Sequence, residues 1–184
     1  MPIEPLKETP SQTVGPFVHI GFDPAYAGFS VPFDTGGART DAPGERITLT
    51  GQVLDGSGAA IKDAVLELVQ ADADGRAGNR AIWLRSAIDG VTGRYRFETV
   101  RPGAIQDGWA PYMTVWVFAR GVNLHLETRA YLPEDTAAHL TDPVLSRIEQ
   151  RHRVATLIAT AASPGEYRFD IRLQGDGETV FLDV

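Results

Sequence analysis

The sequence predicts an all-β fold, a β-sandwich preceded by an irregular N-terminal arm and carrying one or two short helices. Three observations predict it: short runs in which apolar and polar residues alternate, turn residues between those runs, and a composition typical of one soluble domain. The 184 residues are 43% hydrophobic and 22% charged, so the chain can bury an apolar core. We expect a single domain over residues 1–184, with the arm at 1–46 and the sandwich at 47–184.

The arm is rich in Pro, Gly and Asp and has neither helical nor strand periodicity. It nevertheless contains five aromatic residues, where a disordered tail usually has few; they are Phe17, Phe22, Tyr26, Phe29 and Phe33. We therefore expect the arm to lie against apolar surface of its own chain or of a partner. Residues 1–13 place charges among prolines, a pattern that predicts neither a signal peptide nor a membrane span.

The first strand is expected at 47–54, where apolar and polar residues alternate until Asp55-Gly56, a strong turn signal. A returning strand is expected at 64–69. Further runs rich in β-branched and aromatic residues, separated by Gly, Pro and Asp, predict strands at 94–100, 113–119, 124–132, 166–173 and 178–182. About seven short strands are typical of a β-sandwich.

One stretch, 142–159, has a helical pattern. Pro143 suits the first helical position, and Val144, Leu145 and Ile148 have helix-like spacing. We expect a helical insertion there.

Charge and cysteine content exclude several classes of function. The net charge is −7 and no run is rich in Lys or Arg, which argues against nucleic-acid binding. The absence of cysteine excludes a disulfide, a thiolate nucleophile, a zinc ribbon and an iron–sulfur site within this chain, and agrees with a cytoplasmic location. In so acidic a chain, a small anionic ligand would need a local guanidinium or a ring of backbone amides.

The residue patterns alone predict no catalytic centre. No two of the four histidines, His19, His125, His139 and His152, lie within four residues of each other, so no local pair of metal ligands exists. A histidine site assembled from distant segments stays open. No G-x-S-x-G motif marks a nucleophilic serine.

Several segments together resemble the intradiol ring-cleavage dioxygenases. They are 9–17 (TPSQTVGPF), 51–55 (GQVLD), 67–75 (ELVQADADG), 100–103 (VRPG), 118–121 (FARG) and 167–171 (YRFDI). Their order and spacing over nearly the whole chain make the resemblance specific. It implies a fold and a chemistry in which ferric iron and dioxygen open an aromatic ring between two hydroxyl-bearing carbons. The arm resembles in particular the iron-free chain of those members that are built from two kinds of chain and act on protocatechuate.

The resemblance also implies where iron ligands should lie, namely two tyrosines and a His-x-His pair that follows a Trp-Arg-Pro-x motif. In this sequence that motif corresponds to residues 109–112, and the pair falls on Met113 and Val115. The remaining family positions correspond to Ala110 for the arginine that would stabilise the substrate, to Ile105 for one tyrosine, and to the tyrosine-free stretch 70–93 for the other. Ferric iron prefers anionic oxygen and imidazole ligands. We therefore expect neither catalytic nor metal-binding residues in this chain, and expect Fe(III) to be held by a partner beta subunit.

What the resemblance assigns to this chain is a set of substrate-binding residues, Thr13, Gly15 and Pro16 in the arm and Arg129 in the sandwich. Glycine lets the backbone approach a ligand closely, and proline stiffens the turn. The Arg129 guanidinium suits a carboxylate of the substrate or of the beta chain. The alternatives stay open: an ordinary turn for the arm residues, and a salt bridge with Glu127 or Glu134 for Arg129.

The leading hypothesis is thus a non-catalytic subunit that pairs with an iron-bearing beta subunit in a heteromer and shares its pocket for protocatechuate. A freestanding β-sandwich binding module is the alternative from another class, because such folds also bind ligands without a metal. A third possibility is an autonomous dioxygenase with unusual ligands.

Overall fold

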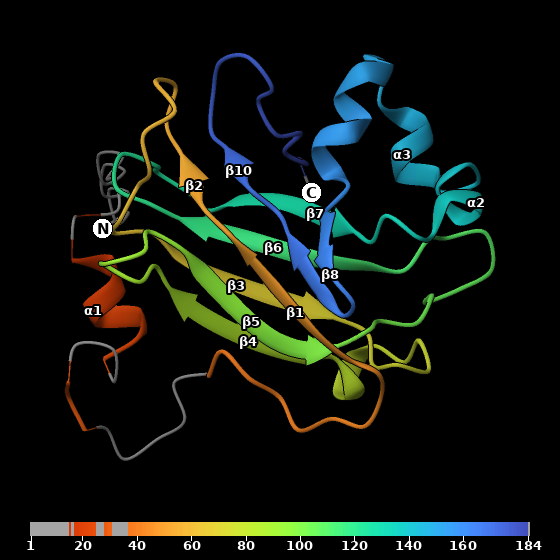
Figure 1. Ribbon diagram of the computed structural model, residues 1–184, viewed down its shortest axis with the longest axis horizontal. Coiled ribbons are helices and arrows are strands. Elements are labelled where there is room, and N and C mark those ends of the chain that lie inside the picture. Colours follow the sequence, from red (N-terminus) through yellow and green to blue (C-terminus); the bar gives the residue numbers. More distant parts are fainter. Residues whose placement is uncertain (1–14, 16, 25–27, 31–36, 184) are drawn as a thin grey trace, which may run out of the picture.

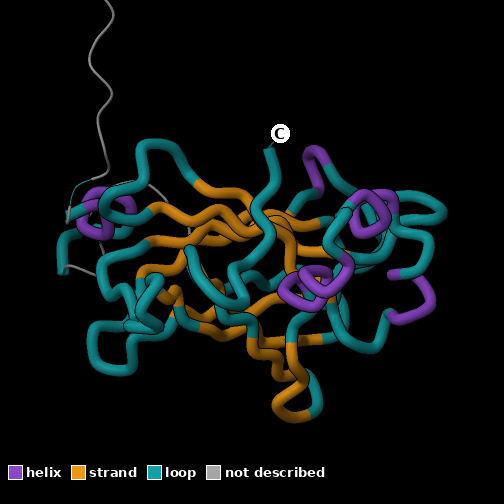
Figure 2. Tube along the Cα trace, turned by 90° about the horizontal axis from the view of Figure 1, so that it is seen from above, coloured by secondary structure: helices purple, strands orange, loops and turns teal. Residues whose placement is uncertain are grey.

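The computed structural model describes residues 15, 17–24, 28–30 and 37–183. Two four-stranded sheets face each other, and a two-stranded ribbon extends beside them (Figure 1). Seen from above, the strands occupy the middle of the molecule while helices and loops lie towards both ends (Figure 2). The predicted β-sandwich is therefore confirmed.

The first sheet joins the beginning and the end of the described sandwich. Its strands lie in the order β5 (Tyr95–Val100), β1 (Arg46–Gly51), β9 (Glu166–Arg168) and β8 (Thr160–Ser163). Strand β1 is antiparallel to β5 and parallel to β9. The ribbon continues these strands, pairing β2 (Val53–Leu54) in parallel with β10 (Ile171–Arg172).

The second sheet is antiparallel throughout. Its strands lie in the order β4 (Ile82–Ala87), β3 (Val65–Gln70), β6 (Tyr112–Phe118) and β7 (Leu126–Tyr131). Alternate residues point to opposite faces of a strand, and the burial of β6 follows that rule, with every second residue fully buried against the first sheet. We call the face towards the first sheet the inner face and the opposite one the outer face.

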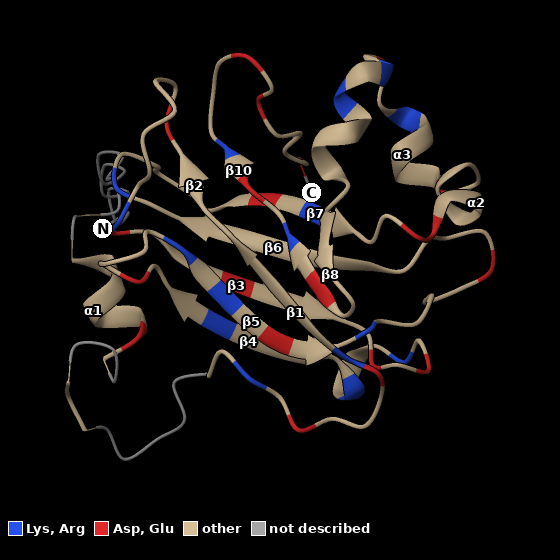
Figure 3. Cartoon of the chain, in the orientation of Figure 1, with Lys and Arg blue, Asp and Glu red and all other residues tan. Residues whose placement is uncertain are grey.

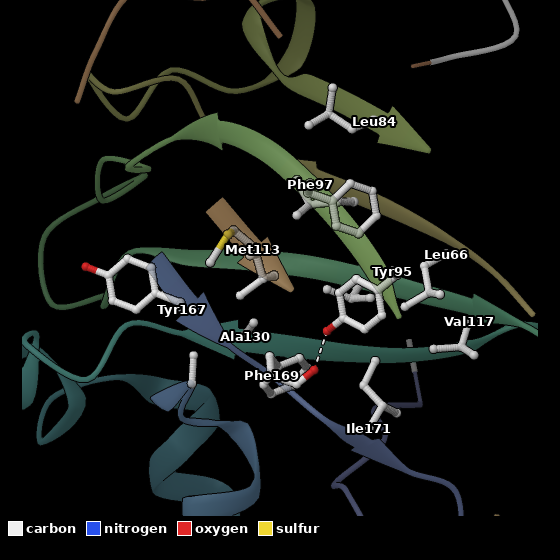
Figure 4. Close-up of a cluster of buried hydrophobic side chains, with 14 of the residues drawn as sticks. Leu66, Leu84, Tyr95, Phe97, Met113, Val117, Ala130, Tyr167, Phe169 and Ile171 are labelled. Atoms are coloured by element: carbon white, nitrogen blue, oxygen red, sulfur yellow. Dashed lines mark hydrogen bonds between the residues drawn. The ribbon is translucent and has the colours of Figure 1, made fainter. Parts of the chain in front are cut away.

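The core lies between the inner faces and is formed by aliphatic and aromatic side chains of both sheets (Figure 4). Tyr95 is fully buried there, and its hydroxyl donates a hydrogen bond to the carbonyl oxygen of Phe169. Burial raises the pKa of Tyr95 well above the ordinary value of a tyrosine. A phenol keeps its proton in such a place, and the hydrogen bond ties strand β5 to the segment that leads from β9 to β10.

The helices are short and lie at the two ends of the sandwich (Figure 1). Helix α1 (Val18–Phe22) is at one end; α2 (Thr136–His139), α3 (Pro143–Arg147) and the 3-10 helix η2 (Arg151–Leu157) are at the other, and a second 3-10 turn, η1, spans Gly78–Arg80. None of the described helices is long and apolar enough to cross a membrane. Basic and acidic residues are interspersed along the described strands and loops (Figure 3).

The predicted helical stretch 142–159 begins as expected, with Asp142 as its N-cap and Pro143 in the first turn. It does not continue as one helix, because Ile148 has extended backbone angles that end α3 before η2 begins. Two helices, α1 and α2, were not predicted from the sequence.

Six of the predicted strand runs contain strands whose bounds are shorter or shifted by one residue. The run at 178–182 was wrong. It forms only an isolated bridge between Leu182 and Glu127. The prediction missed β4, where Trp83 interrupts the alternation between Ile82 and Leu84, and β8, whose small residues become a strand only by pairing with β9. The run at 64–69 does not return beside the first strand, since β3 belongs to the other sheet.

Candidate anion-binding site around Arg129

Arg129 lies on the outer face of the second sheet. In the antiparallel pair of β6 and β7, it stands opposite Thr114, and Tyr131 stands opposite Tyr112. Their neighbours Thr128 and Ala130 are fully buried on the inner face. The alternation of side chains along β7 thus directs the guanidinium away from the space between the two sheets.

Two aromatic rings hold the guanidinium of Arg129. Its central carbon lies 3.9 Å from the ring centroid of Tyr112 and 5.5 Å from that of Trp109. Such cation–π contacts fix a planar cation without saturating its N–H groups. The Nε and Nη1 atoms of Arg129 are buried and have no hydrogen-bond partner among the described residues. These free donors are what a carboxylate could accept from.

Neither carboxylate considered for a salt bridge is available to Arg129. Glu127 accepts a 2.7 Å hydrogen bond from Trp116 Nε1, and Glu134 accepts one of 3.1 Å from the Tyr167 hydroxyl and lies 3.8 Å from Arg101. Within the described part of the chain, Arg129 forms no ion pair with a carboxylate. The predicted alternative of a structural salt bridge is therefore wrong for these residues.

Asp142 holds together the segments beside Arg129. It is fully buried, and its Oδ1 accepts hydrogen bonds of 2.9 Å from the backbone N–H groups of Val144 and Leu145 at the start of α3. The same oxygen accepts a bond from the Tyr131 hydroxyl at 3.3 Å, and Oδ2 accepts one from the backbone N–H of Ala110 at 3.1 Å. One carboxylate thus joins α3, strand β7 and the loop that carries Trp109.

Tyr131 is fully buried behind Arg129. Burial raises the pKa of its phenol above the ordinary range, Arg129 beside it opposes that rise, and the negative charge of Asp142 adds to it. The imidazole of His139 meets the Tyr131 ring edge-on at 5.8 Å, and its buried Nε2 has no hydrogen-bond partner among the described residues. The site is therefore lined by rings and by a phenol that stays protonated.

The positions that correspond to the family's histidine pair lie on the inner face instead. Met113 and Val115 are both fully buried in the main core, where Figure 4 places Met113 among the apolar side chains. Ala110 is also fully buried, in the cluster beside α3. The described residues contain no group of three or more His, Cys, Asp or Glu that could hold a metal. A thioether and an isopropyl group do not fit ferric iron.

Of the predicted arm residues, the structure describes only Gly15; Thr13 and Pro16 lie outside the described residues. The Gly15 carbonyl oxygen accepts a hydrogen bond of 3.3 Å from Val18, so the residue forms a turn before α1. It is exposed, its φ does not require glycine, and a Cβ atom there would meet nothing within 4 Å. Nothing within the described part of the chain requires a glycine at this position.

The described arm and Arg129 meet different parts of the same outer face. Phe22 of the arm contacts Phe118, whereas Arg129 stands opposite Thr114, four residues away along β6. At about 3.3 Å per residue this separation is roughly 13 Å. The structure therefore places both elements on one face but does not bring Phe22 and Arg129 into contact.

Sequence reasoning missed four residues that build the site: Trp109, Tyr112, Tyr131 and Asp142. Tyr131 could have been found from its i, i+2 spacing to Arg129 on the predicted strand. Asp142 is the first residue of the predicted helical stretch, but its contacts with Ala110 and Tyr131 have no local signal in the sequence.

The fold and the site define a β-sandwich protein of the dioxygenase type, and the chain belongs to the dioxygenase family. The sequence pattern of that family, described as Dioxygenase, matches residues 24–175.

Particular members are similar over their full length. The chain is 43% identical over 201 residues to the protocatechuate 3,4-dioxygenase alpha chain of Pseudomonas putida, covering all of both chains. It is 40% identical over 194 residues to the alpha chain of the same enzyme from Burkholderia cepacia, covering 97% of this chain and 98% of that one. The beta chain from Burkholderia cepacia is 28% identical over 161 residues, covering 74% of this chain and 67% of that one. The predicted resemblance is confirmed.

Solved structures share the fold. An intradiol ring-cleavage dioxygenase from Tetranychus urticae superposes with a TM-score of 0.56 at 17% identity, covering 78% of this chain and 89% of that one. A dioxygenase domain from Streptomyces sp. SirexAA-E gives a TM-score of 0.55 at 22% identity, covering 80% and 93%.

Proposed function

We propose that this chain is the iron-free alpha subunit of a protocatechuate 3,4-dioxygenase. It pairs with an iron(III)-bearing beta subunit in an alpha–beta heteromer of higher order and completes a shared pocket for protocatechuate. There the ring is opened between its hydroxyl-bearing carbons to 3-carboxy-cis,cis-muconate, as part of aromatic catabolism. The proposal includes a cytoplasmic location, for which the absence of cysteine is the support.

One observation carries the proposal: Arg129 has buried, unpartnered N–H groups and faces away from the chain's own inter-sheet space. Met113 and Val115, which correspond to the family's histidine pair, are apolar core residues, so these positions cannot hold a metal inside this chain. A guanidinium that points outwards from such a chain suits an anion held at the surface of another one.

The chemical role assigned to Arg129 is to bind the substrate carboxylate. Protocatechuate differs from catechol by that one group, and the acidic balance of this chain, −7, does not favour an anion without a local cation. Tyr112 and Trp109 hold the guanidinium plane, and Asp142 holds the loop that bears Trp109. In the arm, Thr13, Gly15 and Pro16 are proposed to reach the same pocket; the support is the resemblance and the unconstrained Gly15 turn.

The test is Arg129→Ala in the reconstituted heteromer, with assembly and iron content checked first. Loss of a charge-assisted hydrogen bond in a partly buried pocket weakens binding by about one to two powers of ten. We expect KM for protocatechuate to rise by that factor while turnover of catechol changes little, with Arg129→Lys in between. Arg168→Ala, an exposed strand arginine of the other sheet, is the matched control. Equal losses on both substrates would contradict the proposed role.

A further inference from the structure

Arg85 lies on the outer face of the second sheet, on its edge strand β4, and forms an ion pair there. Its Nε atom donates a 2.9 Å hydrogen bond to Glu67 on the neighbouring strand β3, and Nη2 donates to the same carboxylate. The two side chains are only 16% and 8% exposed, so this is an enclosed ion pair rather than a surface one. The pair holds the guanidinium in one orientation.

The third nitrogen of that guanidinium, Nη1, contacts the arm. Arg85 Nη1 donates a 2.6 Å hydrogen bond to the carbonyl oxygen of Phe22, the last residue of α1. The guanidinium carbon lies 4.9 Å from the Phe22 ring centroid and 4.8 Å from that of Trp83. The Phe22 ring also packs against Phe118 at 4.8 Å.

The backbone of Arg85 holds a second point of the arm. Its N–H donates a 3.1 Å hydrogen bond to the carbonyl oxygen of Gly37. Beyond Gly37 the chain crosses to the first sheet, where Glu98 donates its N–H to Ala38 and accepts that of Thr40. Phe22 and Gly37, fifteen residues apart, are thus both bound to one residue.

Helix α1 is short. It is five residues long, none of its residues is buried, and its N-cap makes no side-chain hydrogen bond. A helix this short is unstable on its own and takes its position from the contacts it makes. Phe22 supplies such contacts to Arg85 and Phe118, and Gly15 lies only seven residues before it.

We propose that Arg85 is a positioning residue that fixes α1 on the sheet and, through it, the turn at Gly15. The inference rests on the proposed function, in which that turn forms part of the shared pocket. Arg85 touches neither the substrate nor the metal in this scheme. It acts by limiting where the arm can lie, and preorganisation of this kind lowers the entropy lost on binding.

The first experiment uses the isolated chain and does not depend on the proposed function. Amide hydrogen exchange is measured for residues 20–23 in Arg85→Ala, Arg85→Lys and Phe22→Ala. We expect exchange at least about tenfold faster in the alanine variants and an intermediate rate in Arg85→Lys, which keeps the charge beside Glu67 but not the planar fork. Arg168→Ala, the exposed arginine on β9 of the other sheet, is the control and should leave these rates unchanged.

Phe22→Ala keeps the Arg85–Glu67 pair, so it tests the contact even if Arg85→Ala fails to fold. Protection of the β3 amides shows that the sheet is intact in each variant. Unchanged exchange at residues 20–23 in a folded Phe22→Ala and Arg85→Lys would overturn the proposal.

The second experiment uses the heteromer with both substrates. Since the arm is positioned without reference to a carboxylate, Phe22→Ala and Arg85→Ala should raise KM by about three- to tenfold for protocatechuate and catechol alike, with kcat changed less. Faster exchange with an unchanged KM on both substrates would overturn the positioning role. If Arg129→Ala fails to discriminate between the substrates while the Arg85 variants behave as stated, the carboxylate role of Arg129 fails and that of Arg85 stands.

Discussion

The two faces of the second sheet use the same strands for opposite purposes. On the inner face, Met113, Val115 and Ala130 are fully buried and apolar. On the outer face, the intervening residues Thr114 and Arg129 are partly exposed and polar. Because side chains alternate along a strand, one face can become a closed core while the other keeps a charged group.

The difference shows how a family member can keep the sandwich with apolar residues at the positions that correspond to the family's histidine pair. An apolar residue in a core position needs no partner, and it stabilises the sandwich by burying surface. The unpaired guanidinium atoms of Arg129 instead cost about 1–3 kcal/mol as buried polar groups without partners. This unfavourable arrangement fits the proposal that the Arg129 guanidinium binds a carboxylate that does not belong to this chain.

The largest expected effect comes from returning histidines to the inner face. Met113→His combined with Val115→His would bury two imidazoles among apolar side chains. This should lower the free energy of unfolding by about 2–6 kcal/mol. Urea unfolding measures the loss, with Met113→Leu and Val115→Ile as volume-conserving controls. We expect both the native chain and the double variant to purify without stoichiometric iron or tyrosinate-to-iron absorption. Tight binding of one iron per chain would show that the inner face is still a metal site.

The next effect concerns Asp142, which joins α3, strand β7 and the loop that carries Trp109. Asp142→Ala removes the cap of α3 and leaves the N–H of Ala110 and the hydroxyl of Tyr131 without their acceptor. We expect a loss of about 2–4 kcal/mol, and a smaller one for Asp142→Asn, which keeps one oxygen. Thermal and urea unfolding provide the measurement. A loss below about 0.5 kcal/mol would mean that Asp142 does not hold these segments together.

A smaller effect depends on pH. The pKa of Tyr131 in the folded chain is raised above the ordinary value of 10.0. The contribution of the protonated phenol to the free energy of unfolding is therefore complete below pH 10 and is lost as the pH rises beyond it. There the unfolded chain releases a proton that the folded chain keeps. Stability should fall by about 1.4 kcal/mol per pH unit for each such tyrosine. Tyr131→Phe should reduce the fall of unfolding free energy between pH 10 and 11, leaving the part of that fall that is due to Tyr95. An unchanged pH dependence would contradict the burial of the Tyr131 phenol.

The smallest effect is expected on the open part of the outer face. Glu127→Gln keeps an acceptor for Trp116 Nε1 and removes only the charge, so unfolding free energy should change by less than about 1 kcal/mol. Tryptophan emission reports the local contact, and Glu166→Gln, an exposed change on β9, serves as control. A loss above about 2 kcal/mol would show that the outer face is as tightly constrained as the inner one.

The sequence predicted the sandwich because alternation of apolar and polar residues reports directly on which face of a strand is buried. It failed at β8, whose residues Thr160–Ser163 have no alternation and owe their conformation to β9. It also failed at 178–182, where alternation was present but only Leu182 found a partner strand. Pairing between distant segments decided both cases.

For the site, the sequence by itself determined which chemistry is absent and which is available. Without histidine at 113 or 115 the corresponding ligands do not exist, and Arg129 was identified through the family resemblance on a predicted strand. Only the tertiary structure decided that Met113 and Arg129 lie on opposite faces, that Trp109 and Tyr112 contact the guanidinium, and that Asp142 holds the adjoining loop. The physical reason is that residue types fix charge and ligand capacity locally, whereas burial, ring contacts and unpaired donors depend on which segments the register of the sheets brings together.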